Sequence, residues 1–177
     1  MAQMRKGNRD LIKEINRNLI LNMIKNHGPV SRTDLARLSR LSPASVSGIT
    51  SSLIASNMVQ VTGEGESRGG RRPVLLRLNT RAGYVVGLKL MENSLTIALT
   101  DLDANILDHR VVPLSTNGGS LAVGVVLPKL IQVIEQTINQ AKIDTQRVLG
   151  IGIGLAGSID GESGVCRYSP YFNWRNV

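Results

Sequence analysis

The chain has 177 residues, of which 42% are hydrophobic and 3% aromatic, and its formal net charge is +8. The one cysteine, Cys166, excludes an intramolecular disulfide, and together with two histidines it forms no recognisable zinc cluster, so we expect no cofactor here. Scarce aromatic residues argue against stacking of single-stranded nucleic acid, and without a signal peptide or an apolar run of about 18 residues we expect a cytoplasmic protein with no membrane partner.

The first predicted element is a helix over residues 8–27, where apolar residues recur every three or four positions. Gly28 and Pro29 predict its end, because glycine accepts a left-handed conformation and proline cannot continue a helix. A second, short helix is predicted to begin after Ser31. The hydroxyl of Ser31 suits an N-cap, and Asp34 in the first turn suits the helix dipole.

The third predicted helix begins after Ser42, a good N-cap, with Pro43 at its first position. One side of this helix is apolar and carries Val46, Ile49, Leu53 and Ile54. The other side carries small or hydroxylated residues, which are Ala44, Ser45, Ser47, Gly48, Thr50 and Ser51. Short side chains let a helix approach base edges in the major groove, and hydroxyl groups can bond bases or phosphates. This side is predicted to bind double-stranded DNA; the alternative is a face that packs on another helix.

A β-hairpin is predicted after the third helix, with strands over residues 58–62 and 73–78 and a glycine-rich loop between them. Three helices followed by a hairpin is the order of a winged helix-turn-helix. The loop carries Arg68, Arg71 and Arg72 beside glycines, a combination suited to the narrow minor groove of DNA. We expect these three arginines to contact DNA, with Arg32 and Arg40, near helix ends, as phosphate contacts.

Positive charge is concentrated in the first half of the chain. Residues 1–81 hold 14 Lys and Arg against 5 Asp and Glu, whereas residues 82–177 hold 7 against 8. A basic module joined to a near-neutral one is typical of a nucleic-acid-binding head on a different body. We therefore predict a winged helix-turn-helix DNA-binding domain over residues 1–80 and a separate domain over residues 81–177.

The second half reads as an α/β half-domain. Strands are predicted over residues 84–89, 95–100 and 106–112, followed by a helix over residues 121–142 that Pro128 should kink or break. Residues 148–155 form a nearly continuous apolar run with glycines, which predicts a buried strand. The Gly-x-Gly-x-x-Gly spacing of a dinucleotide-binding motif occurs at Gly152, Gly154 and Gly157. A turn sequence follows these glycines, whereas the motif requires a helix there. The acidic residues of the turns, Asp101 and Asp160 among them, are expected to bond the backbone.

Several stretches resemble the ROK family (repressor, open reading frame, kinase). They are the segment from NRDLIKEI to SSLI, GEGESRGGRRPVLLRLN, VVGLKLMENSLTIALTDLDANIL and GIGIGLAGSIDGESGVCRYSPYFNWRNV. The resemblance implies an α/β two-part chain: a winged helix-turn-helix followed by the first half of a sugar-kinase-like (ribonuclease H-like, actin-like ATPase) domain. It also implies that Gly157 lies on a loop near a sugar-binding pocket.

Departures from the family pattern argue against catalysis. Kinase members carry an Asp-x-Gly-Gly-Thr turn that holds ATP phosphates, and the matching positions here are Lys89, Met91, Glu92 and Asn93. A lysine replaces the acid, both glycines are missing, and the carboxylate of Glu92 would repel phosphate. The resemblance therefore implies a protein that is not an enzyme.

Length is the second departure, because family members continue for about as long again. The catalytic aspartate and the zinc loop of the family would lie beyond Val177, so zinc is expected only if a C-terminal half exists. We interpret residues 81–177 as a truncated domain, which should leave apolar surface uncovered.

The sequence thus predicts a DNA-binding transcriptional regulator, in particular a repressor of carbohydrate genes controlled by a sugar. Its expected DNA-binding residues are Arg32, Arg40, Ser42, Ala44, Ser45, Ser47, Thr50, Arg68, Arg71 and Arg72. A homo-oligomer is expected, because helix-turn-helix proteins bind paired half-sites. Two alternatives stay open: a sugar kinase of the same family with an added DNA-binding head, and a DNA-binding module that senses no effector.

Overall fold

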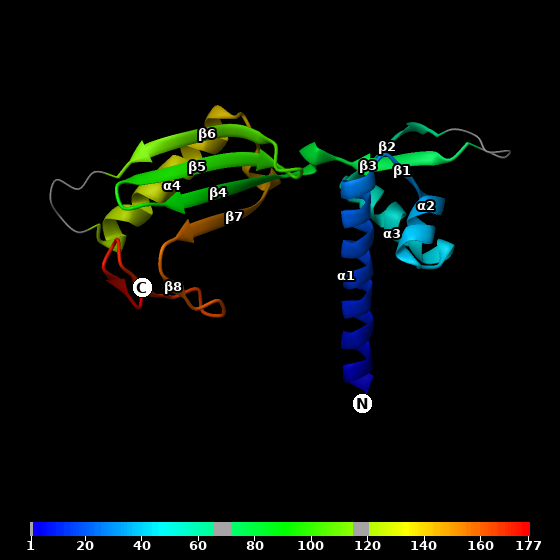
Figure 1. The fold of residues 1–177 in the computed structure, drawn as a ribbon, viewed down its shortest axis with the longest axis horizontal. Helices are drawn as coiled ribbons and strands as arrows, with labels where there is room; N and C mark the ends of the chain where they lie inside the picture. The colour runs from blue at the N-terminus through cyan, green and yellow to red at the C-terminus, as the bar shows by residue number, and fades with distance from the viewer. Residues whose placement is uncertain (1, 66–71, 115–120) are drawn as a thin grey trace. The chain divides into compact units, whose positions relative to one another are not determined.

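A computed structural model describes residues 2–65, 72–114 and 121–177 of the chain, with side chains from residue 8 onward. These residues divide into two compact units, Met1–Thr80 and Arg81–Val177 (Figure 1). Each unit has a hydrophobic core of its own. Within the described ranges, no helix combines the length and the apolar composition needed to cross a membrane.

The first unit contains the three predicted helices, α1 (Ala2–His27), α2 (Arg32–Ser39) and α3 (Pro43–Ala55). Both predicted serine caps are confirmed. Oγ of Ser31 accepts the N–H of Asp34 at 3.1 Å, and Oγ of Ser42 accepts the N–H of Ser45 at 3.1 Å. Each cap satisfies a backbone donor that has no partner inside its own helix.

The apolar residues of α1 do not form one buried stripe, as their spacing predicts. Ile20 and Ile24 are buried, whereas Leu11, Ile12 and Ile15 are 55%, 50% and 55% exposed. The reason is that α1 extends past the elements it packs against, so only its C-terminal half reaches the core of this unit (Figure 1).

A three-stranded sheet completes the first unit, with β1 (Val30–Ser31), β2 (Val59–Glu64) and β3 (Val74–Leu78) in the order β1-β3-β2. All neighbouring strands are antiparallel. The hairpin of β2 and β3 matches the predicted strands within two residues. The core of the unit joins helices and sheet through Ile20, Ile24, Val30, Leu35, Val46, Leu53, Val59 and Leu76.

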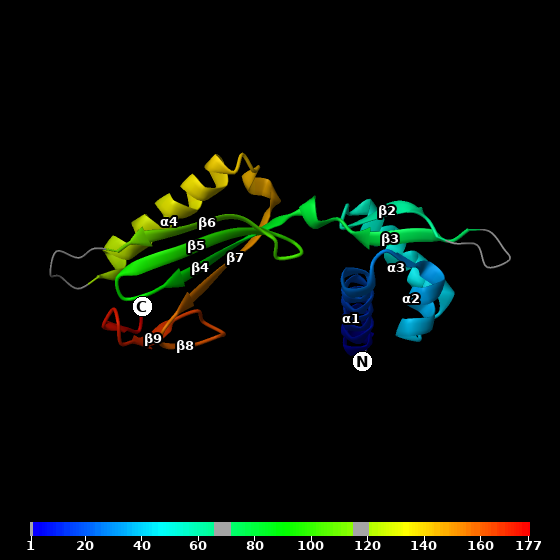
Figure 2. The same cartoon turned by 45° about the horizontal axis from the view of Figure 1, so that its top comes forward.

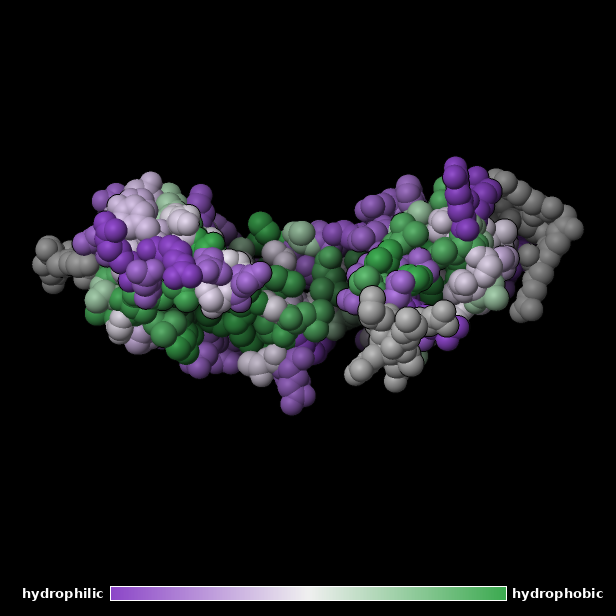
Figure 3. Space-filling model, turned by 90° about the horizontal axis from the view of Figure 1, so that it is seen from below, coloured by the Kyte–Doolittle hydropathy of each residue, from purple (hydrophilic) through white to green (hydrophobic). Residues whose placement is uncertain are grey.

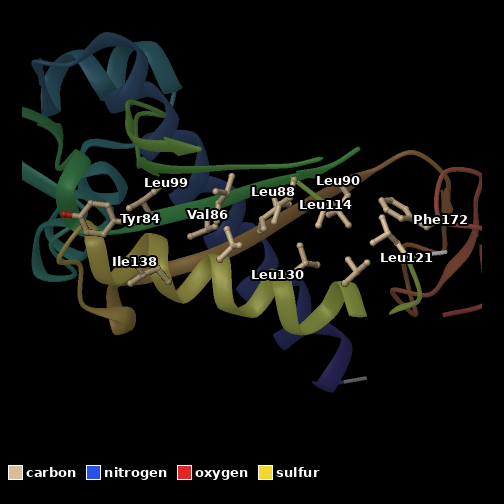
Figure 4. Close-up of a cluster of buried hydrophobic side chains, with 14 residues drawn as sticks. Tyr84, Val86, Leu88, Leu90, Leu99, Leu114, Leu121, Leu130, Ile138 and Phe172 are labelled. Atoms are coloured by element: carbon tan, nitrogen blue, oxygen red, sulfur yellow. The ribbon is translucent and has the colours of Figure 1, made fainter. Parts of the chain in front are cut away.

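The second unit is built on a four-stranded sheet of β4 (Tyr84–Leu90), β5 (Ser94–Asp101), β6 (Ile106–Pro113) and β7 (Val148–Leu155). The strand order is β6-β5-β4-β7, with β4 and β7 parallel and the other pairs antiparallel. Helix α4 (Val123–Gln140) covers one face (Figure 2). Every second side chain of β4 and β5 points toward α4 and forms the core with Leu130, Ile138 and others (Figure 4).

Pro128 does not break the helix, because α4 runs through this residue from Val123 to Gln140, and the alternative of a kink at this residue stays a prediction. Pro128 lies in the second turn, and proline removes only the hydrogen bond to the carbonyl four residues earlier, that of Gly124. Contacts of Val126, Leu130 and Val133 with the core hold the helix on both sides of the proline.

The prediction that β7 is buried is also wrong. Its side chains Leu149, Ile151 and Ile153 are 58%, 50% and 48% exposed. By register Ile151 and Ile153 lie beside Val86 and Leu88 of β4, but β7 is an edge strand of the described sheet and α4 does not reach over it. A continuous hydrophobic area is visible on the second unit (Figure 3). The expectation of uncovered apolar surface is therefore confirmed.

After β7, the chain forms a small antiparallel sheet of β8 (Ser158–Ile159), β9 (Cys166–Ser169) and β10 (Trp174–Arg175). As the turn sequence predicts, no helix follows the glycines of β7. The rings of Phe172 and Trp174 stack with centroids 4.7 Å apart, and Nε1 of Trp174 donates to the carbonyl of Leu121 at 2.7 Å. These contacts attach the end of the chain to the core beside α4.

Candidate nucleic-acid interface

The N-terminal part of α3 presents a face of short side chains. Ala44, Ser45, Ser47, Gly48 and Ser51 are all exposed, and a Cβ added at Gly48 would meet open space. Ser42, also exposed, caps the helix and shares a hydrogen bond of 2.8 Å between its Oγ and that of Ser45. This face has room for a close approach of another molecule to the helix backbone.

Thr50 does not belong to this face, which corrects the prediction that it contacts DNA. Its side chain is fully buried, since position 50 lies one turn after Val46 on the core side of the helix. Oγ1 of Thr50 donates to the carbonyl of Val46 at 2.9 Å and accepts the Nε hydrogen of Arg32, also at 2.9 Å. Thr50 thus connects α3 to α2.

The two arginines predicted near helix ends differ in their surroundings. Arg32 is half-buried at the start of α2, and its bond to Thr50 orients the guanidinium group. Arg40 is exposed and forms the C-cap of α2 in a left-handed conformation, with φ of 59°. A phosphate contact by either residue stays a prediction.

Sequence reasoning missed a second arginine that holds α3. Arg17 of α1 donates from Nη1 to Oγ of Ser52 at 2.9 Å and from Nη2 to Oγ of Ser56 at 3.2 Å. Ser52 and Ser56 are four residues apart, so they lie on one side of α3 and can accept both arms of one guanidinium group. That spacing is the signal in the sequence, but it does not indicate which arginine is the partner.

Of the three arginines in the hairpin loop, Arg68 and Arg71 lie outside the described residues. Arg72 is exposed just before β3 and lines a hollow together with Arg32. At the loop end of the hairpin, the N–H of Gly65 donates to the carbonyl of Pro73 at 2.8 Å. The structure therefore brings one predicted loop contact next to one predicted helix contact.

A separate pocket of about 580 Å³ lies at the carboxyl ends of the parallel strands β4 and β7. It is lined by Lys89, Leu90, Met91, Gly154, Leu155, Ala156 and Tyr171. Among the described residues of this lining, Lys89 is the one charged residue and none is a carboxylate. Glu92 and Asn93 lie in the turn to β5 and do not line the pocket. Gly157, which follows β7, does not line it either.

Gly157 has a structural reason to be glycine. A Cβ at this position would collide with the carbonyl oxygen of Tyr168 on β9. The glycine thus permits the pairing of β8 with β9. A role in binding a ligand stays a prediction.

The acidic turns have the structural role expected of them. The carboxylate of Asp101 accepts the N–H groups of Asp103 and Asn105 at 2.9 and 3.0 Å. The N–H of Ser163, the guanidinium group of Arg167 and the N–H of Glu162 lower the pKa of Asp160 to about 2. Among residues 2–65, 72–114 and 121–177, no group of three or more His, Cys, Asp or Glu side chains is placed to hold a metal ion.

Comparison with known proteins points to transcriptional regulators. No protein-family model matches the chain. Over 97% of its length, the chain is 35% identical to a protein named putative xylose repressor from Caldicellulosiruptor sp. (strain Rt8B.4), and it covers 42% of that protein. Over 96% of its length, it is 31% identical to the DNA-binding transcriptional dual regulator NagC of Escherichia coli (strain K12), of which it covers 41%.

Among solved structures, the chain matches a ROK family transcriptional regulator described as a homolog of the E. coli MLC protein. The TM-score is 0.76 and the identity 31%, over 94% of this chain and 41% of the other. The similarity therefore extends over both units. The chain is thus similar to transcriptional regulators that include a ROK family member, and it spans about two fifths of the length of the regulators that it matches.

Proposed function

We propose that this chain is the DNA-binding part, with a portion of the effector-responsive body, of a sugar-controlled transcriptional repressor of carbohydrate genes. The observation that carries the proposal is the exposed face of short side chains on α3, held to its neighbours by Arg17 and Arg32. The names of the relatives, xylose repressor and NagC, support it.

In this proposal the first unit is a winged helix-turn-helix. Helix α3 enters the major groove, where Ser42, Ala44, Ser45 and Ser47 contact base edges or nearby phosphates. The loop between β2 and β3 is the wing, whose arginines Arg68, Arg71 and Arg72 contact the minor groove and the phosphates that border it. The order of three helices followed by an antiparallel hairpin supports this assignment.

The second unit is proposed to be the first half of a sugar-kinase-like domain that responds to a sugar. Its sheet has the chain order third, second, first, fourth, with the fourth strand parallel to the first. Ligands of such sheets bind at the carboxyl ends of parallel strands, and the pocket beside Lys89 lies there. With a lysine and no carboxylate in that lining, regulation is favoured over phosphoryl transfer.

The test is selection of bound duplexes from a random DNA library by the full chain. We expect enrichment of one palindromic sequence, because helix-turn-helix proteins bind two half-sites about one helical turn apart. Ser47→Leu should reduce discrimination between the selected and a scrambled duplex without changing the salt dependence. Ser47→Ala is the matched control and should bind nearly like the wild type. Failure to enrich any sequence, or equal affinity for selected and scrambled duplexes, would overturn the proposal.

Addition of xylose, glucose or N-acetylglucosamine to the bound complex tests the sugar response. We expect one of these sugars to weaken binding of the selected duplex when it is supplied to a chain extended to the length of the relatives. A protein whose DNA affinity none of the three sugars changes would contradict control by this class of effector.

A further inference from the structure

A hollow in the first unit brings two arginines together. It has a volume of about 220 Å³ and is lined by Ser31, Arg32, Thr33, Arg72, Pro73 and Val74. Arg32 belongs to the first turn of α2, whereas Arg72 comes from the residues before β3. The two arginines thus come from distant parts of the sequence and line the same hollow.

Strand pairing explains why they meet. The two residues of β1 pair with β3, Ser31 opposite Leu75 and Val30 opposite Leu76. Because the strands are antiparallel, the chain after Ser31 runs toward the residues that precede β3. Helix α2 starts directly after β1, so its first residues lie beside Pro73 and Arg72. The pairing of β1 with β3 therefore brings the described residues of the hollow together.

The charges around the hollow favour an anion. None of the described residues that line it is acidic. Arg72 forms no hydrogen bond or ion pair with another described residue, and Arg32 bonds only Thr50, through Nε. Two like charges that share a hollow repel each other unless an anion lies between them. The Nη groups of Arg32 and the whole guanidinium group of Arg72 can donate to such an anion.

Asp34, the acidic residue nearest to Arg32 along the chain, already has two partners. Asp34 accepts a hydrogen bond from Oγ of Ser31 at 2.7 Å and one from Nη2 of Arg37 at 3.2 Å. Its carboxylate thus has bonds to the cap and to α2 itself. The hydrogen bond from Nε of Arg32 to Thr50 orients the guanidinium group before any ligand binds.

Size selects the class of anion. Sites for drug-sized molecules usually measure about 300–1,000 Å³. The hollow, at about 220 Å³, is smaller than these sites. Such a space accepts one phosphate group with a few waters, and the planar fork of arginine matches phosphate oxygens in pairs.

We infer that this hollow binds one phosphate group of the DNA backbone, with Arg32 and Arg72 as joint ligands. The inference rests on the proposed DNA-binding function. It adds that the start of α2 and the residues just before β3 bind the same phosphate group. It makes Arg32 and Arg72 one unit rather than two independent contacts. Such a contact positions the protein on DNA and reads no base sequence.

The first experiment is a titration of labelled duplexes, selected and scrambled, by the wild type, Arg32→Ala, Arg72→Ala and the double variant at several salt concentrations. Each single variant should lose about tenfold in affinity for both duplexes, the usual effect of one hydrogen bond to a charged group. The double variant should lose little more than either single one. Its log–log salt slope should fall by about 0.9, the value for one phosphate, rather than about 1.8. Additive losses with a slope change near 1.8 would overturn the shared site.

Neutral methylphosphonate linkages, placed one at a time in the selected duplex, locate the phosphate. One position should weaken binding by the wild type and have no effect on either Arg32→Ala or Arg72→Ala. If the two variants respond to different positions, the inference is wrong. Arg37→Ala is the matched control, since Arg37 lies on α2 outside the hollow and pairs with Asp34. Arg72→Ala carries the test even if Arg32→Ala disturbs α3, because Arg72 bonds no other described residue.

A titration with inorganic phosphate tests whether the hollow binds a phosphate of the DNA backbone or a free phosphate ion. We expect the guanidinium resonances of Arg32 and Arg72 to shift together when phosphate replaces chloride at equal ionic strength, and duplex DNA to abolish that shift. A phosphate-dependent shift that persists in the DNA complex, with unchanged DNA affinity of the variants, would assign the hollow to a free anion and overturn the inference. A wild type that binds no duplex would instead remove the proposed function itself.

Discussion

Arg17 of α1 reaches α3, where its Nη1 donates to Oγ of Ser52 at 2.9 Å. The second arm of the same guanidinium group donates to Ser56 at 3.2 Å. On the opposite side, Arg32 of α2 donates to Thr50. Helix α3 is thus held from two neighbouring helices by arginine side chains in addition to its apolar contacts.

Replacing Arg17 should loosen α3. We expect Arg17→Ala to lower the free energy of unfolding of the first unit by about 1 kcal/mol, because two hydrogen bonds at the surface are lost. Urea unfolding followed by far-UV circular dichroism measures this change. Fluorescence of Trp174, the one tryptophan of the sequence, reports the second unit and should not change.

Arg9→Ala is the matched control for this prediction. Arg9 lies exposed on the same helix, and its loss removes one positive charge without removing a bond to α3. Its effect should stay within about 0.5 kcal/mol. Equal effects of Arg9→Ala and Arg17→Ala would show that charge, rather than the bonds to α3, matters.

The buried hydroxyl of Thr50 should matter for both stability and DNA binding. Thr50→Val keeps the volume but leaves Nε of Arg32 without its acceptor, so we expect a loss of about 1–2 kcal/mol and weaker binding of the selected duplex. Thermal unfolding and the duplex titration measure the two effects.

Thr137 provides the comparison for Thr50. It is also fully buried in a helix, and its Oγ1 bonds the carbonyl of Val133 at 2.8 Å, but no arginine donates to it. Thr137→Val should therefore cost clearly less stability in the second unit and leave DNA affinity unchanged. If both variants lose equal stability and neither loses DNA affinity, the bond from Arg32 has no positioning role.

The pocket beside Lys89 should not support phosphoryl transfer. The Asp-x-Gly-Gly-Thr pattern of the kinases would place an acid and glycines where this chain has Lys89 and the turn 91–93. Incubation with ATP, Mg²⁺ and xylose, glucose or N-acetylglucosamine should give no sugar phosphate above the buffer blank, with a sugar kinase as the positive control. Turnover above the blank would make the kinase alternative the better reading.

Acid titration should show the low pKa of Asp160. Bonds from Ser163, Arg167 and Glu162 stabilise the charged carboxylate, and they hold its pKa at about 2 against an ordinary value of 3.8. Because the folded pKa lies below the unfolded one, this group contributes stability above about pH 4, and the contribution is lost as the pH falls toward 2. A carboxyl-detected NMR titration measures the pKa.

Arg167→Ala should raise the pKa of Asp160 only in part, because the N–H of Ser163 is the larger cause and is retained. Glu162→Gln is the control, since Glu162 donates through its backbone N–H, which the substitution keeps. A pKa of Asp160 near 3.8 in the wild type would contradict the turn geometry.

Features that depend on neighbouring residues could be predicted from the sequence. The serine caps of α2 and α3, the end of α1 at Gly28 and the hairpin strands all follow from bonds within a few residues. Burial could not be predicted in the same way. The stripe of Leu11, Ile12 and Ile15 has the spacing of a core face, yet nothing in the described unit packs on it, and the apolar run of β7 lies at a sheet edge.

The sequence by itself determined the helices, the hairpin of β2 and β3 and the basic first half, because these depend on local bonds and on composition. Only the tertiary structure decided that Thr50 faces inward, that Arg17 holds Ser52, and that Arg32 and Arg72 line one hollow. These relationships come from pairing and packing between distant segments, above all the register of β1 against β3. No local pattern encodes such a register, because it is set by the free energy of the whole unit.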